Sequence, residues 1–216
     1  MNQTGFPKKA QWIGAVGCPA PVIRRRFTLS AEDIPAAELF ITGLGYFEAS
    51  VNGCPVSADR FQPVISDYEK RTFVKINYPC RDTFTHRIYY CRYPVSALLR
   101  EGENELEIRL GGGWYNQTER IAEGEMAYGS ILKAIYELRR GEDILLASDG
   151  SEVWHAGDIV FSNLFIGEIH DRTAPAAAEQ PVVILSAPQS EMTEQIGTPD
   201  RVIRTIRPIV IGTVDG

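Results

Sequence analysis

Two carboxylates flanking a histidine are the first residues whose types and spacing could do chemistry. Glu168 and Asp171 lie three positions apart, with His170 between them. Cleavage of a glycosidic bond needs two carboxyl groups, one acting as an acid and the other as a base or nucleophile. Residues three apart in a strand, however, point to opposite faces of the sheet. We therefore predict no catalytic pair, and we expect both carboxylates to hydrogen-bond loop backbone or an arginine such as Arg172.

An aromatic pair after a glycine run is the best candidate for binding a ligand. Trp114 and Tyr115 directly follow the glycines at 111–113. Glycine lets backbone come close to another group, and a flat aromatic face suits the C–H face of a sugar ring. Polar side chains that could contact sugar hydroxyls are Asn116, Asp67, Asn104 and Glu168. The alternative is that Trp114 packs beneath the glycine loop as core and Tyr115 covers an edge.

Other catalytic and metal-binding patterns do not occur in the sequence. There is no GxSxG nucleophile motif, and the glycine run lacks the Lys-Ser/Thr of a phosphate-binding loop. The histidines are too scattered to suggest a metal site, at positions 86, 155 and 170. The four cysteines form no CxxC and no regular framework, and paired disulfides stay an open alternative; they are Cys18, Cys54, Cys80 and Cys91.

Composition and charge narrow the class of protein. The 216 residues are 44% hydrophobic and 23% charged, which is enough to build a core without disulfides. The net charge of −6 gives no electrostatic reason to expect nucleic acid or an anionic membrane as a partner. The N-terminus lacks the apolar segment of a signal peptide, and no run approaches the ~20 apolar residues that span a bilayer. We therefore expect a cytoplasmic location.

The elements that would position these residues are short strands. Residues 105–110 alternate cleanly, and residues 46–51 run into Asn52-Gly53. Asn-Gly is a strong hairpin signal because both central residues of a type I′ turn need positive φ. Further strands are expected at 38–42, 130–138, 144–147 and 159–161, with a turn at 140–143 and one short helical turn at 95–100. Many short strands with few helices favour an all-β fold, a β-sandwich or jelly roll.

The character of the chain changes after Arg172. Residues 173–181 are rich in alanine and proline, as in a linker. The alternating residues 202–206 and 209–211 are expected to form one or two more strands, and an apolar strand without a partner is an aggregation hazard. We therefore predict a β-sandwich module over residues 1–175, followed by residues 176–216 as a linker and strands that lead to a further domain.

Several segments, taken in order, resemble the N-terminal region of bacterial α-L-rhamnosidases of glycoside hydrolase family 78. They are Gln11–Gly14, Arg25–Leu29, Leu39–Glu48, Val51–Gly53, Ser66–Arg71, Leu98–Asn104, Leu110–Tyr115, Ser148–Ser151 and Ser162–Arg172. Each segment alone is common, and the specificity lies in the ordered set. Two features depart from the family pattern. The segment 73–93 is longer, and Ile65 and Gly112 stand where the family often has a tryptophan and an asparagine or aspartate.

The resemblance implies a jelly-roll β-sandwich like those of carbohydrate-binding modules, acting as a non-catalytic ancillary module of an α-L-rhamnosidase. The family's acidic catalytic residues lie in a large α-helical barrel, so the implied partner is a downstream catalytic domain of the same polypeptide. The family also includes modules that hold rhamnose with a calcium ion. This implies a rhamnose-containing glycan as ligand, and Asp67, Asn116 and Glu168 carry oxygens of the kind that calcium prefers. The alternative is a purely structural scaffold with no ligand of its own.

Overall fold

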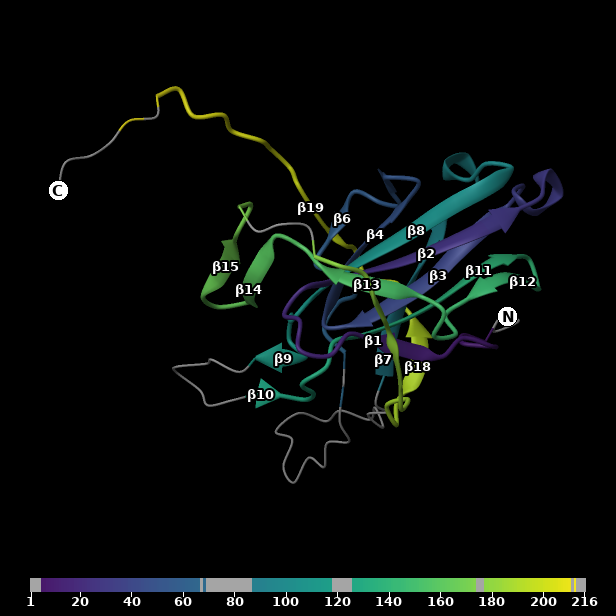
Figure 1. Ribbon diagram of the computed structural model, residues 1–216, viewed down its shortest axis with the longest axis horizontal. Coiled ribbons are helices and arrows are strands. Elements are labelled where there is room, and N and C mark those ends of the chain that lie inside the picture. Colours follow the sequence, from purple (N-terminus) through teal and green to yellow (C-terminus); the bar gives the residue numbers. More distant parts are fainter. Residues whose placement is uncertain are drawn as a thin grey trace, which may run out of the picture.

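Alternation of apolar and polar residues builds the strands of a two-sheet sandwich in the computed structural model (Figure 1), which describes residues 5–66, 68, 87–117, 126–173, 177–210 and 212. In β8 (Gly102–Gly111) every second residue from Asn104 to Leu110 is buried, and those between them are half-buried. Such a strand lays one face on the core. The two facing sheets confirm the predicted all-β sandwich, while the finer jelly-roll assignment stays a prediction.

The larger sheet has seven strands within the described residues. Their order is β17 (Val183–Leu185), β1 (Trp12–Gly14), β11 (Lys133–Arg140), β3 (Ala37–Leu44), β7 (Arg87–Pro94) and β18 (Glu191–Glu194), and β12 (Asp143–Ala147) pairs with β11 beyond β1. The pairs are antiparallel except β18 with β7, which is parallel. The central strands β11 and β3 match from Lys133↔Leu44 to Arg140↔Ala37.

The smaller sheet has six strands in the described part of the chain. Their order is β16 (Gln180–Pro181), β13 (Val153–Ala156), β2 (Pro21–Leu29), β8, β4 (Tyr46–Val51) and β5 (Cys54–Pro55). The core lies between the two sheets. Around one small void, Leu39 and Leu138 of the larger sheet meet side chains of the smaller sheet, among them Phe27, Val51 and Leu106.

Three two-stranded pairs and two 3-10 turns complete the secondary structure of the described residues. The pairs are β9 (Asn116–Gln117) with β10 (Met126–Ala127), β14 (Ile159–Asn163) with β15 (Gly167–His170), and β6 (Asp59–Arg60) with β19 (Asp200–Arg201). The turns are η1 (Ala31–Asp33) and η2 (Ser96–Leu98). Among these residues no helix has the length and apolarity to cross a membrane. Cys18, Cys54 and Cys91 are free thiols, and Cys80 lies outside the described residues.

Most of the strands predicted from local signals are present in the structure. The hairpin from β4 to β5 turns at Asn52 and Gly53, whose φ angles are 51° and 77°, as the type I′ prediction requires. The turn at 140–143 lies between β11 and β12, and the short helical turn is η2. The strand expected at 130–138 begins and ends two or three residues later, as β11.

Strands β16 to β19 come from the segment 180–201, which pairs with both sheets and with β6. Residues 202–210 form no strand, in contrast to the expectation from their alternating pattern. The reason is visible in their exposure: Ile203 and Ile209 are each 99% exposed, so no described strand packs beside them. Figure 1 shows this end of the chain running away from the sandwich.

A single residue, Gly45, carries the chain from the larger sheet to the smaller one, since β3 ends at Leu44 and β4 begins at Tyr46. A Cβ atom on Gly45 would lie 2.1 Å from the carbonyl oxygen of Gly112. Real Cβ atoms do not come so close to backbone, so only glycine fits this contact. The glycine run of residues 111–113 therefore approaches the chain's own backbone at the crossing between the sheets.

The outer face of the larger sheet is covered by the N-terminal segment, residues 6–10, through a buried carboxylate. Oε1 of Glu137 accepts backbone N–H bonds of 2.5–2.9 Å from residues 8–10, and Oε2 accepts a bond of 2.7 Å from Nε of Arg139. Burial alone would raise the pKa of Glu137, but these bonds outweigh it and hold the pKa below its ordinary value. The guanidinium of Arg139 lies 4.4 Å from the centre of the Phe40 ring.

We predict that Gly45→Ala destabilises the chain by about 3 kcal/mol, the upper end of the cost of overpacking, because the atoms it meets are backbone. Urea denaturation followed by tryptophan fluorescence measures the loss. Gly197→Ala is the control, since a Cβ there meets nothing within 4 Å, and we expect a change below about 0.5 kcal/mol. Equal stability of the two variants would contradict the close approach.

We also predict that Glu137→Gln lowers the free energy of unfolding by about 3–5 kcal/mol, because it leaves the guanidinium of Arg139 buried without its carboxylate. The matched control is Glu142→Gln, which removes an exposed pair with Lys8 in the same N-terminal segment. Its urea midpoint should not move. If the two midpoints fell together, the buried bonds of Glu137 would not be what holds the segment.

Candidate functional site

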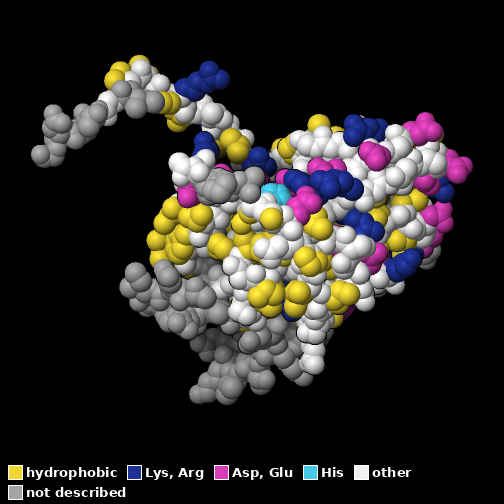
Figure 2. Space-filling view, in the orientation of Figure 1, with side chains coloured by type: hydrophobic (Ala, Val, Ile, Leu, Met, Phe, Trp, Pro, Cys, Tyr) yellow, Lys and Arg dark blue, Asp and Glu magenta, His cyan; other side chains and the backbone are white. Residues whose placement is uncertain are grey.

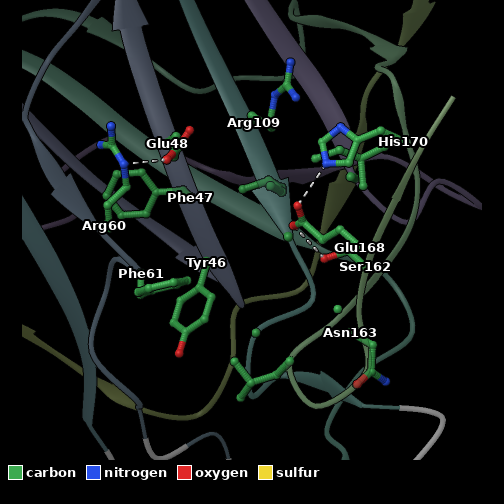
Figure 3. A pocket seen from close by; sticks show the side chains of 17 residues that line it. Tyr46, Phe47, Glu48, Arg60, Phe61, Arg109, Ser162, Asn163, Glu168 and His170 are labelled. Carbon is green, nitrogen blue, oxygen red and sulfur yellow. Dashed lines mark hydrogen bonds and ion pairs between the residues drawn. The ribbon is translucent and has the colours of Figure 1, made fainter. Parts of the chain in front are cut away.

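A groove of about 490 Å³ lies between the smaller sheet and the β14–β15 hairpin. Its floor is formed by β4 and β8, as Figure 3 shows. On one side stand Arg60 and Phe61, here called the aromatic wall. On the other side stand Glu168 and His170, here called the hairpin wall. Polar and apolar groups therefore face the same hollow.

The hairpin wall is held by a chain of ion pairs. Nδ1 of His170 lies 3.1 Å from Oδ2 of Asp158, and its Nε2 lies 3.2 Å from Oε2 of Glu168. Asp158 also accepts a bond of 3.1 Å from Arg109 on β8. Hydrogen bonds to Asp158 and Glu168 raise the pKa of His170 above its ordinary value, and the bond to His170, followed by Arg109, lowers the pKa of Asp158. These pairs tie the hairpin to the floor.

The aromatic wall presents an exposed ring on a constrained backbone. Phe61 is 58% exposed and has a φ of 54°, a left-handed conformation that is an outlier for a bulky side chain. Its ring centre lies 5.5 Å from that of Tyr46, which also lines the groove. The adjacent Gln62 is fixed, because its carbonyl oxygen accepts a bond of 2.7 Å from N–H of Phe47.

The strand pair β6–β19 supports this wall from behind. Asp200 and Arg201 pair with Arg60 and Asp59, and Nε of Arg201 lies 2.8 Å from a carboxylate oxygen of Asp59. Nε of Arg60 lies 3.5 Å from Oε1 of Glu48 on the floor. A segment from near the end of the described chain therefore positions a groove residue that is about 140 residues earlier in sequence.

Of the two predicted aromatic ligands, Trp114 lies close to the groove and Tyr115 lies in the core. Trp114 is half-buried, its ring stands edge-on to Phe165 at 5.5 Å, and its side chain hydrogen-bonds to Tyr46. Tyr115 is 5% exposed and packs at 5.1 Å against Tyr68. Trp114 therefore braces Tyr46, whereas Tyr115 is covered by its neighbours.

The predicted polar ligands are not gathered at one place. Asn104 is buried near the opposite end of β8, where its side chain bonds to Asn52, to the backbone of Arg100 and to the carbonyl of Gly102. Asn104 and Gly111 are seven positions apart along the strand, or about 23 Å. Asn116 follows the Tyr115 cluster, and its Oδ1 is buried with no hydrogen-bond partner among the described residues. Of the predicted polar ligands that the structure describes, Glu168 alone lines the groove.

Calcium binding rested on Asp67, Asn116 and Glu168. Asp67 lies outside the described residues. Both oxygens of Glu168 are engaged, one by His170 at 3.2 Å and the other by Ser162 at 3.4 Å. In the described ranges no group of three or more His, Cys, Asp and Glu side chains is placed to hold a metal ion. Calcium binding stays a prediction.

The two carboxylates singled out first have separate surroundings. Asp171 accepts bonds of 2.8 and 2.6 Å from the backbone N–H and the hydroxyl of Thr173, within its own loop. Glu168 contacts His170, and Arg172 lies 3.8 Å from Asp158. The sequence analysis did not find Glu48, Arg60, Phe61 or Arg109. The one local signal was the position of Phe61, an aromatic residue between charged residues and Gln62-Pro63.

Most of the chain matches a known family. The model of the α-L-rhamnosidase N-terminal domain family matches residues 32–78 and 75–203, so the chain belongs to that family. An α-L-rhamnosidase of Formosa agariphila is 28% identical over 169 residues, which are 74% of this chain and 16% of that protein. The chain spans 16–19% of the length of the curated relatives that it matches.

Solved structures share the fold. The crystal structure of the α-L-rhamnosidase from Aspergillus terreus superposes with a TM-score of 0.72 at 22% identity, covering 91% of this chain and 23% of that one. The α-L-rhamnosidase of Streptomyces avermitilis, complexed with L-rhamnose, has a TM-score of 0.69 at 24% identity, with coverage of 86% and 18%. The family model confirms the resemblance read from the ordered segments, and these structures confirm the fold.

We predict that the ring of His170 titrates above the ordinary histidine value of about 6.5. A raised folded-state pKa means that the contribution of His170 to stability is complete below the ordinary value and is lost as pH rises through the raised one. Ring-proton NMR gives the midpoint, which Asp158→Asn should lower. Asp143→Asn, in the β11–β12 turn, is the control. If the titration midpoint of His170 were the same in Asp158→Asn as in the unmodified chain, the ion pair would not form.

Proposed function

We propose that this chain is a non-catalytic N-terminal module of an α-L-rhamnosidase and packs against the rest of the same polypeptide. Two facts support the proposal. The chain is less than a fifth of the length of its curated relatives, and its groove carboxylates Glu48 and Glu168 each stand beside a cation. Rhamnoside hydrolysis would then belong to residues elsewhere in the polypeptide, and this module would serve that part as a scaffold.

The observation that carries the packing proposal is the apolar surface of the β14–β15 hairpin. Four of its side chains are about half exposed: Val160 49%, Phe165 50%, Ile166 53% and Ile169 58%. Figure 2 shows hydrophobic atoms gathered at the left of the molecule, over this hairpin. Exposed apolar side chains scattered singly are normal, but a contiguous group marks a contact surface.

The occupant that fits this surface is another part of the same polypeptide. Ion pairs of Asp158 tie the hairpin to the sandwich on the groove side, and the four apolar side chains above stay about half exposed. In the curated relatives most of the chain lies outside the matched region. An apolar contact within one polypeptide needs no second molecule, so its cost in lost translational freedom is small.

Carbohydrate binding is a second candidate function, and the groove favours it. An exposed aromatic ring faces the same hollow as guanidinium, carboxylate and imidazole groups. Binding sites for small polar ligands combine an apolar surface with a few placed polar groups. This candidate is independent of the packing surface, which lies on the other side of the hairpin wall.

We predict that amide hydrogens of residues 159–170 exchange more slowly in the complete polypeptide than in this chain alone, because packing would cover the hairpin. Hydrogen-exchange mass spectrometry compares the two. Substituting both Ile166→Asp and Ile169→Asp should remove the difference. Val16→Asp, at an apolar position that is 56% exposed elsewhere, should leave it intact. Identical exchange in the two unmodified proteins would overturn the packing proposal.

A further inference from the structure

We infer that the groove binds a neutral saccharide, with Phe61 as the platform for a sugar ring and Glu48, Arg60 and Arg109 as partners for its hydroxyls. This inference rests on the carbohydrate-binding function proposed above and names its site and ligand class. It does not use Trp114 or Tyr115, which the structure places against Tyr46 and Phe165 and in the core, respectively.

The groove continues beyond the hollow already described. A second cavity of about 240 Å³ shares Phe47, Glu48, Arg60 and Arg109 with the first. The two together cross the outer face of β4 and β8. The first alone, at about 490 Å³, lies within the size range of ligand sites. The shared residues stand where the two cavities meet. One sugar unit at this place would contact these residues and the aromatic wall together.

Phe61 is built to present its ring. A left-handed φ at a bulky residue costs free energy and persists only where the surroundings impose it. Here the surroundings are the bond from Phe47 to Gln62 on one side and the β6–β19 pair on the other. The result is a ring that is 58% exposed and backed by Tyr46. A flat, fixed, exposed ring suits the C–H face of a pyranose.

The polar groups beside the ring keep free bonding capacity. Arg60 and Arg109 are 40% and 39% exposed, and Glu48 is 60% exposed. A guanidinium carries five N–H donors and a carboxylate accepts at both oxygens. Arg60 also donates Nη1 to the carbonyl oxygen of Asp59 at 2.9 Å, and its remaining N–H groups are available beside the ion pair with Glu48. Planar arrays of this kind can bond to two neighbouring hydroxyls at once. Figure 3 shows Glu48 and Arg60 beside Phe61 on the same side of the groove.

Charge balance selects a neutral ligand. Both guanidinium groups of the groove already have an anion, Glu48 for Arg60 at 3.5 Å and Asp158 for Arg109 at 3.1 Å. Glu168 lies 3.2 Å from His170, which is a cation only when protonated. A uronate or phosphate would therefore meet the carboxylates of Glu48 and Glu168 as well as the guanidinium groups. Burying an unpaired charge is costly, whereas hydroxyl groups need only the donors and acceptors that remain. A neutral sugar fits this balance and an anionic one does not.

The test is an NMR titration of this chain with L-rhamnose, a panel of neutral hexoses and D-galacturonate. We expect saturable shifts for at least one neutral sugar, centred on the amides of Glu48, Arg60 and Phe61. Phe61→Asn keeps a residue that tolerates positive φ, and it should weaken binding at least about tenfold. Phe61→Tyr keeps the ring and should hold affinity within about twofold. Melting curves of both variants check that the fold is intact.

The possible results distinguish failure of this site, of the ligand class and of carbohydrate binding itself. Saturable binding that Phe61→Asn leaves unchanged would put the sugar elsewhere, and would overturn this site while carbohydrate binding stands. Tighter binding of D-galacturonate than of every neutral sugar would overturn the ligand class. If none of these sugars binds, both this inference and carbohydrate binding fall. The packing proposal is decided independently, by exchange of the hairpin amides.

Discussion

The contact of Gly45 with Gly112 is the constraint on which the shape of the molecule depends. At this point the chain leaves one sheet and joins the other, and the end of β8 lies directly against it. No side chain separates the two backbones, so they lie in direct contact where the chain crosses between the sheets. Tyr46 follows at once and lines the groove. Gly111 and Gly113 of the glycine run line the groove themselves, and Trp114, the aromatic residue after the run, braces Tyr46.

Charge in this molecule is arranged in pairs, and the two kinds of pair have different consequences. The buried carboxylate of Glu137 has every oxygen bonded and closes the outer face of the larger sheet, so it serves stability alone. The pairs around the groove are partly exposed, and salt and water screen them. They orient side chains without exhausting their hydrogen-bonding capacity. A surface with that property suits reversible recognition of hydroxyl groups, while a hydrolytic site would need two carboxyl groups committed to one bond.

Much of the fold could be predicted from local patterns, and much of the site could not. Alternation in β8 and the Asn-Gly turn act over a few residues, so their outcome is readable in sequence. The burial of Glu137 depends on residues about 130 positions away, and no local pattern records it. The same holds for the groove, whose walls come from β6 and β15. Trp114 and Tyr115 look alike in sequence, yet the packing of Tyr115 against Tyr68 separates them. The ordered family segments succeeded because they sample the whole chain.

On this account the module binds a sugar or supports the rest of the polypeptide, and it does not cleave a glycosidic bond. The most direct test of this claim is an assay of p-nitrophenyl α-L-rhamnoside with the purified chain, followed from acidic to neutral pH. We predict release of nitrophenol no faster than in buffer. Steady turnover by the chain alone that disappears in Glu168→Gln would contradict the claim, because it would show a groove carboxylate at work on the bond.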